Sequence, residues 1–173
     1  MRNIVIAAAL AAIIGQPAAA KQKLFAQTEK FDAASVAWAA APGGSTIKGS
    51  AVLRTLGGEA KTCAGLQVLL IPVSAYSTER MIHQFGAAGR GLQLERSLPF
   101  ATTDPAYLSS MRRTRCDAVG SFEFDRLPQG AFYVVANVTW SAPSRFGLRP
   151  QGGEILERVE IDGQETKQIV VTS

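Results

Sequence analysis

Histidine is nearly absent from this chain, since His83 is the single histidine among 173 residues. Histidine is the usual general base near neutral pH and the commonest side-chain ligand for metals. No Gly-x-Ser-x-Gly elbow marks a nucleophilic serine, and no Gly-Lys-Ser/Thr loop marks a phosphate site. His83 falls in a segment with a helical pattern, where a surface or half-buried helix residue is expected. The sequence therefore predicts no catalytic residue, no cofactor and no metal.

Excess charge of one sign is also scarce. Without Arg2, which belongs to the leader described below, 17 basic residues face 14 acidic ones, a net charge of +3. The charges are scattered along the chain, so the sequence pI near 9.3 is weak evidence for a polyanionic partner. We expect no nucleic-acid partner.

Long apolar runs are missing as well. Residues 4–14 form an uncharged apolar run of eleven residues, whereas a membrane-spanning helix needs about 20. Arg2 precedes this run, residues 15–17 break it, and three alanines end at Ala20, the order of a secretory signal peptide. The sequence predicts cleavage after Ala20, a bacterial periplasmic or secreted location, and no transmembrane segment afterwards. An uncleaved N-terminal anchor is the alternative.

Cysteine is limited to two residues, Cys63 and Cys116, and no Cys-x-x-Cys pair exists. In an exported protein an even pair of cysteines is read first as a structural disulfide. Closing a loop of about fifty residues would contribute on the order of 4 kcal/mol in the chain-entropy model. A metal half-site and a redox pair are the alternatives.

Strand patterns dominate what is present. Residues 47–54 alternate between apolar and polar side chains, and residues 66–73 are apolar at almost every position, as in a strand covered on both faces. Alternation returns at residues 111–116 and 121–125 and is strongest at residues 132–140. The sequence therefore predicts an all-β fold, an antiparallel β-sandwich of about seven strands.

The remaining segments complete the expected organisation. A short helical insertion is predicted at residues 77–86, with Ser77 as N-cap and Gly86 as the stop. Residues 87–106 and 141–151 read as loops, and Asp162-Gly163 reads as the turn of a closing hairpin. The predicted segments are a signal peptide at 1–20, a lead-in at 21–45 and a sandwich domain at 46–173.

The middle of the chain resembles the carboxypeptidase regulatory-like family, a transthyretin-like (prealbumin-like) β-sandwich. Residues 49–54 and 64–72 resemble the family's first two strands. Residues 115–124 resemble its T-D-x-x-G-x-F-x-F hairpin, with Cys116 in place of the threonine. Residues 127–134 resemble its L-P-x-G-x-Y-x-V motif. The resemblance covers residues 47–140, with 74–110 departing as an insertion.

This resemblance implies a role class, because members of that family serve as accessory, folding or recognition modules in exported and surface proteins. The expected function is thus a non-enzymatic binding or accessory module of the bacterial cell envelope. Its partner is expected to be an unidentified protein or envelope component. A structural subunit of an envelope assembly and a hydrolase acting through His83 are the alternatives.

Arginine supplies the candidate contact surface. The residues expected to form it lie near the 115–124 hairpin and in the segment after Trp140: Arg112, Arg113, Arg115, Arg145, Phe146 and Arg149. Arginines beside aromatic rings are typical of contact surfaces and pair with carboxylates or phosphates. Solvated strand edges that discourage aggregation are the alternative reading.

Overall fold

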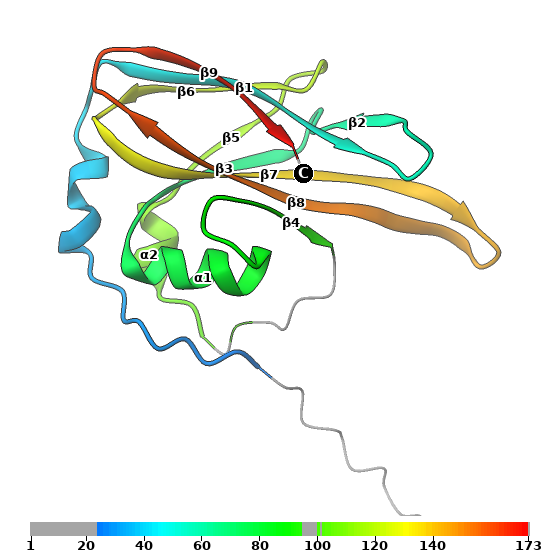
Figure 1. Cartoon of the computed structure of the whole chain (residues 1–173), viewed down its shortest axis with the longest axis horizontal. Coiled ribbons are helices and arrows are strands. Elements are labelled where there is room, and N and C mark those ends of the chain that lie inside the picture. The colour runs from blue at the N-terminus through cyan, green and yellow to red at the C-terminus, as the bar shows by residue number, and fades with distance from the viewer. Residues whose placement is uncertain (1–23, 95–99, 101, 173) are drawn as a thin grey trace, which may run out of the picture.

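The computed structural model of the protein describes residues 24–94, 100 and 102–172 (Figure 1). The predicted signal peptide, residues 1–20, lies outside this range. In chain order the elements are η1 (a 3-10 helix, Ala34–Ala40), β1 (Ser45–Arg54), β2 (Ala60–Thr62), β3 (Gln67–Pro72), α1 (Ala75–Phe85), β4 (Arg90–Leu94), α2 (Pro105–Ser110), β5 (Arg112–Arg115), β6 (Ser121–Leu127), β7 (Gly130–Ser144), β8 (Gly147–Ile161) and β9 (Thr166–Thr172). No helix within the described ranges is long and apolar enough to span a membrane.

Two sheets pack face to face, which confirms the predicted all-β sandwich. One sheet has the order β4-β8-β7-β3-β5, and every pairing in it is antiparallel. In the other, β1 pairs with β6 and β2 along one edge and with β9 along the other. The β1–β9 pairing is parallel, and the described chain has nine strands because the short β2 and β4 add to the seven expected.

The main core fills the space between the two sheets. The predicted face of β7 contributes Phe132, Val134, Ala136 and Val138, all buried. Because side chains alternate across a strand, the opposite face of β7 points away from the other sheet. That outer face is covered by α1, which lies beneath the five-stranded sheet (Figure 1).

A second core therefore forms between α1 and the outer face of this sheet. Tyr133 and Val135 of β7 pack there with Met81 and Phe85 of α1. Strand β3 lies between the two cores, with Val68 in the main core and Ile71 in the second. This position explains why residues 66–73 are apolar on both faces.

The helix α1 begins earlier than predicted. Ser74 is its N-cap, and Ser77 is the third residue of a capping box in which each serine side chain accepts from the other's backbone N–H. The prediction of Ser77 as N-cap was therefore wrong by one turn of helix. The predicted stop is confirmed, because Gly86 has φ 76°, a left-handed conformation that glycine adopts without steric cost.

Arg80 of α1 joins the lead-in and the segment before α2 to the second core. Its side chain is buried, with the guanidinium carbon 3.6 Å from the centre of the Phe100 ring. Nη1 donates to Gln27 Oε1 at 3.0 Å, and Nη2 donates to Thr103 Oγ1 at 3.0 Å. The segment that was read as a lead-in is thereby attached to the domain.

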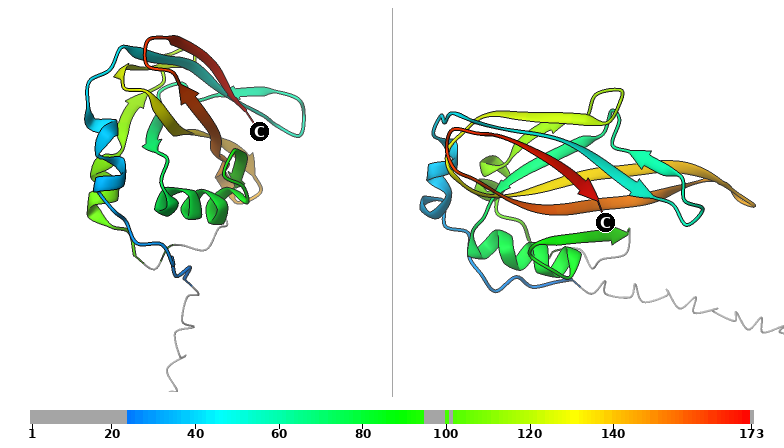
Figure 2. Two further views of the ribbon diagram at one scale, coloured as in Figure 1. Left: turned by 60° about the vertical axis from the view of Figure 1, so that its left-hand side comes forward. Right: turned by 45° about the horizontal axis from the view of Figure 1, so that its top comes forward.

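Three local predictions need correction. The stretch 87–106, read as a loop, contains strand β4 and the first residues of α2. The stretch 141–151, read as a loop, belongs to the β7–β8 hairpin, whose pairing continues to Ser144 and Gly147. This hairpin extends beyond the rest of the sandwich (Figure 2).

The turn at Asp162-Gly163 also differs from the prediction. These residues do not close a hairpin, because β8 pairs with β7 and β4 whereas β9 pairs with β1 in the other sheet. The turn therefore carries the chain from one sheet to the other. The change of sheet brings Val171 into the main core, where it is fully buried.

Candidate functional site

The two cysteines form a disulfide, as predicted. Cys63 follows β2 and Cys116 follows β5, and their Cα atoms lie 5.7 Å apart. The bond joins the end of a strand of one sheet to the end of a strand of the other. Both cysteines are engaged in this bond, so no free thiol is left in the described residues to serve as a metal half-site.

His83 packs among aromatic rings. Its imidazole stacks on Phe25, with ring centres 3.6 Å apart and planes 13° apart. Phe100 meets the imidazole edge-on at 5.1 Å. These contacts join the N-terminal segment to α1.

The first arginine group lies along the edge strand β5. Arg112 Nη2 donates to the backbone oxygen of Asp125 at 2.8 Å. Arg113 donates to the oxygen of Leu108, and Arg115 to that of Gly65. Each guanidinium in this group thus has a hydrogen bond within the fold.

The second arginine group lies at the turn of the β7–β8 hairpin. The Arg145 guanidinium lies 4.9 Å from the centre of the exposed Phe146 ring, and Arg149 follows on β8. The β5 strand lies well away from this turn (Figures 1 and 2). The fold does not bring the two groups together, and a contact role for either stays a prediction.

A cleft opens at the end of the sandwich from which the hairpin projects. Its volume is about 760 Å³, and Trp140 of β7, Leu92 of β4 and Arg54 at the end of β1 line it. We call it the Trp140 cleft. Trp140 is half-buried, with one part of its indole against the main core and another toward the cleft.

Two polar side chains that line the Trp140 cleft make no polar contact with the described residues. The side chains of Arg54 and Gln151 have neither a hydrogen bond nor an ion pair to the described part of the chain. Gln151 is directly opposite Trp140 in the β7–β8 register, so both side chains lie on the same face. The cleft thus combines an aromatic surface with free hydrogen-bonding groups.

The outer face of the five-stranded sheet carries a polar row next to α1. Asn137, Glu154 and Gln93 are aligned across β7, β8 and β4 and line a cavity of about 200 Å³. Gln84 of α1 donates to Glu154 Oε2 at 2.6 Å. Burial raises the pKa of Glu154, although the hydrogen bond from Gln84 acts in the opposite direction.

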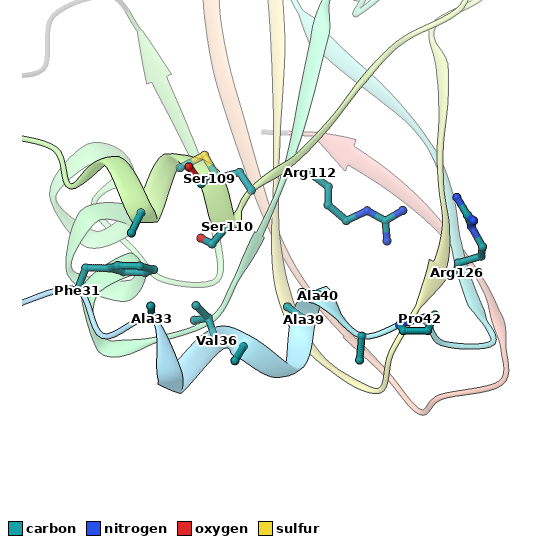
Figure 3. A pocket seen from close by; sticks show the side chains of 14 residues that line it. Phe31, Ala33, Val36, Ala39, Ala40, Pro42, Ser109, Ser110, Arg112 and Arg126 are labelled. Atoms are coloured by element: carbon teal, nitrogen blue, oxygen red, sulfur yellow. The ribbon is translucent and has the colours of Figure 1, made fainter.

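A third hollow of about 550 Å³ lies between η1 and α2, and we call it the η1–α2 cavity (Figure 3). Phe31, Val36 and several alanines form its apolar walls, and Arg112 and Arg126 lie together toward one end of it. Of the residues predicted to form a contact surface, Arg112 alone lines this cavity.

Sequence reasoning missed Trp140, Arg54 and Gln151, as well as Arg126. Trp140 was recognised as part of a strand face but not as a cleft residue. A signal for Arg126 was present, because Phe124 and Leu127 are three residues apart where alternation requires two. No group of three or more His, Cys, Asp or Glu residues suited to a metal occurs among the described residues.

Comparison with known proteins supports the fold and leaves the family open. Neither a family model nor a curated protein sequence matches the chain. A solved structure from Pseudomonas aeruginosa, named a "putative carbohydrate binding protein", matches with a TM-score of 0.71 and 23% identity. The match covers 84% of this chain and 99% of that one. The two proteins share a fold, and the carboxypeptidase regulatory-like resemblance stays a prediction.

Proposed function

We propose that this protein is an exported, non-enzymatic carbohydrate-binding module whose saccharide site is the Trp140 cleft. The observation that carries the proposal is the half-buried indole of Trp140 in one cleft with the side chains of Arg54 and Gln151, which form no hydrogen bond or ion pair with the described residues. A binding site of this kind is concave, mostly apolar, and contains a few polar groups that set the orientation of the ligand.

Saccharides suit this combination because a pyranose ring has an apolar C–H face and a rim of hydroxyl groups. The C–H face would lie on the indole, a large and rigid apolar surface. The hydroxyl groups would bond with Arg54, which offers only donors, and with Gln151, which offers both donors and an acceptor. The cleft volume of about 760 Å³ is of the size found for small-molecule sites.

The name of the P. aeruginosa protein supports the ligand class, since it describes carbohydrate binding and that protein shares this fold. Fold alone does not determine function, and the residues of the cleft are what favour a saccharide here. The predicted leader and the Cys63–Cys116 disulfide support an extracytoplasmic location, where disulfides form and persist. Envelope polysaccharides would be accessible there.

Fluorescence of Trp140 provides the test. The chain has two tryptophans, Trp38 and Trp140, so Trp38→Phe leaves Trp140 as the single indole reporter. This variant would be titrated with dextran, mannan, chitotetraose and polygalacturonate. We expect at least one of them to shift the Trp140 emission to shorter wavelength, because stacking removes the indole from water.

Affinity measurements by calorimetry then locate the site. In the wild-type background, Trp140→Ala and Arg54→Gln should each weaken binding of that saccharide at least tenfold. Phe146→Ala and Arg149→Gln, on the same hairpin but outside the cleft, should leave it unchanged. If none of the four saccharides binds, or if Trp140→Ala binds as tightly as wild type, the proposal is wrong.

A further inference from the structure

Arg126 has an unusual backbone conformation. Its φ is 51°, the one positive value among the described non-glycine residues. Side chains with a Cβ pay a free-energy cost in this left-handed region, and such strain is concentrated at functional sites. The strained residue in this fold therefore calls for a functional explanation.

The strain coincides with a β-bulge in β6. Ser45 pairs with Leu127 and Ile47 pairs with Phe124, so Asp125 and Arg126 together lie opposite one residue of β1. A bulge changes the direction of a side chain that strict alternation would place on the other face. As a result Asp125 and Arg126 are both exposed, although they are consecutive in the strand.

The bulge brings together three charged side chains. Arg126 Nε lies 3.3 Å from Asp125 Oδ2, and Arg112 Nη2 lies 3.5 Å from Asp125 Oδ1. Two guanidinium groups thus share one carboxylate, which leaves an excess of one positive charge. Each guanidinium has five N–H donors, and most of them form no bond to the described residues.

The segment before β1 packs against the bulge and holds its backbone in place. Gly43 donates its N–H to the backbone oxygen of Arg126 at 3.2 Å. A Cβ at Gly43 would collide with the backbone oxygen of Leu127, so only glycine fits this contact. The bulge is therefore held by its neighbours and is not a frayed strand end.

The charged group lies at the η1–α2 cavity, whose other walls are apolar except for two serines (Figure 3). The two serines that line the cavity already donate within α2 and its end, Ser109 to the oxygen of Pro105 and Ser110 to that of Tyr107. Arg112 and Arg126 are consequently the side-chain donors available to a ligand in the described part of this cavity.

We propose that the η1–α2 cavity binds an amphiphilic monocarboxylate, with the carboxylate on Arg112 and Arg126 and the apolar part against Phe31, Val36 and the alanines. Guanidinium groups match carboxylates in geometry and charge. The single excess positive charge suits a monoanion better than a phosphate dianion. This site goes beyond the proposed saccharide function, because the η1–α2 cavity and the Trp140 cleft have no lining residue in common.

The test uses the disulfide-bonded protein and two-dimensional NMR titrations. Octanoate and N-acetylphenylalanine distinguish an acyl chain from a peptide-like carboxylate, and octan-1-ol and acetate supply the apolar part and the anion separately. We expect saturable shifts in the amide signals of Ala37, Ala40 and Ala106 with at least one of the two amphiphilic carboxylates. Octan-1-ol and acetate should bind at least tenfold more weakly.

Arg126→Gly separates binding from folding, because glycine adopts φ 51° without strain. Its urea midpoint should equal or exceed that of wild type, while carboxylate affinity falls at least tenfold. Arg112→Gln should show the same loss, and Arg145→Gln, at the hairpin turn, should show none. The proposal is overturned if neither carboxylate binds, if octan-1-ol binds as tightly, or if Arg126→Gly keeps full affinity.

Discussion

The indole of Trp140 lies directly over Gly152 of the neighbouring strand. A Cβ at Gly152 would be 2.8 Å from Cζ3 of Trp140 and would also collide with the backbone oxygen of Val138. Gly152 has φ 96°, a conformation that side chains with a Cβ rarely adopt. The glycine thus determines both the local path of β8 and the position of the indole in the Trp140 cleft.

Gly152→Ala should therefore weaken the fold and the cleft together. The added methyl group requires a strained φ, a shift of the Val138 carbonyl and a displaced indole, and we expect a loss of about 1–3 kcal/mol in the free energy of unfolding. Urea denaturation measures this loss. Gly147→Ala is the control for backbone strain alone, because Gly147 has φ 96° and an added Cβ there meets no atom within 4 Å. Equal stability of the two variants would contradict the close contacts of Gly152 with the Val138 carbonyl and the Trp140 indole.

Removal of the disulfide should cost about 4 kcal/mol in the chain-entropy model, since the bond closes a loop across 53 residues. Urea denaturation of the Cys63→Ser/Cys116→Ser double variant, compared with wild type under oxidising conditions, checks this value. Adding a reductant to wild type should lower its midpoint, whereas the double variant should not respond. A double variant as stable as wild type would show that the loop is already constrained by its strand pairing.

Glu154 should make stability depend on pH. Burial raises the pKa of Glu154 in the folded state. The stability that the protonated side chain contributes is therefore fully present below the ordinary glutamate pKa, and it is lost as the pH rises through the raised pKa. Glu154→Gln keeps a hydrogen-bonding side chain without the charge. The variant should match wild type in urea midpoint at pH 4 and exceed it at pH 8.

Glu157→Gln is the matched control for that experiment. Glu157 lies on the same strand and accepts from Arg90 Nε at 2.7 Å and from Arg90 Nη2 at 3.0 Å. Because Glu157→Gln breaks this ion pair, its urea midpoint at pH 8 should not exceed that of wild type. If Glu154→Gln were less stable than wild type at pH 8, the cost assigned to its buried charge would be wrong.

Arg80→Ala should loosen the attachment of the N-terminal segment. The variant removes the contact with the Phe100 ring and the hydrogen bonds to Gln27 and Thr103. We expect a loss of about 2–4 kcal/mol in the free energy of unfolding. Hydrogen exchange should accelerate in residues 24–33 and 102–104 more than in β7.

Arg80→Lys tests the role of the planar guanidinium. Lysine keeps the charge but cannot stack on the phenyl ring or donate in two directions from a fixed plane. We expect it to recover less than half of the lost stability. Full recovery would mean that charge alone holds the segment.

Local structure was largely predictable because it depends on period and turn chemistry. Alternation at residues 132–140 correctly assigned Phe132 to one face of β7 and Tyr133 to the other, and Gly86 correctly marked the end of α1. The disulfide followed from two cysteines in a chain with a predicted leader. None of these inferences needs the position of a distant residue.

The candidate sites depended on contacts between distant segments. Trp140 and Arg54 line one cleft, and Arg112 of β5 meets Asp125 and Arg126 of β6, because separate strands come together. The spacing of Phe124 and Leu127 hinted at the bulge, but it did not reveal which side chain would turn outward or what it would meet.

The amino-acid sequence by itself determined the strand faces, the turns and the pair of cysteines, because alternation and turn preference act between neighbouring residues. Tertiary structure decided which strands pair. Asp162-Gly163 has the chemistry of a hairpin turn, yet β9 pairs with β1. One edge of β8 pairs with β7, and β4 pairs with part of its other edge. The pairing of β9 with β1 buries Val171 in the main core. A turn sets the local direction of the chain, whereas the burial of apolar side chains determines which strand the next segment pairs with.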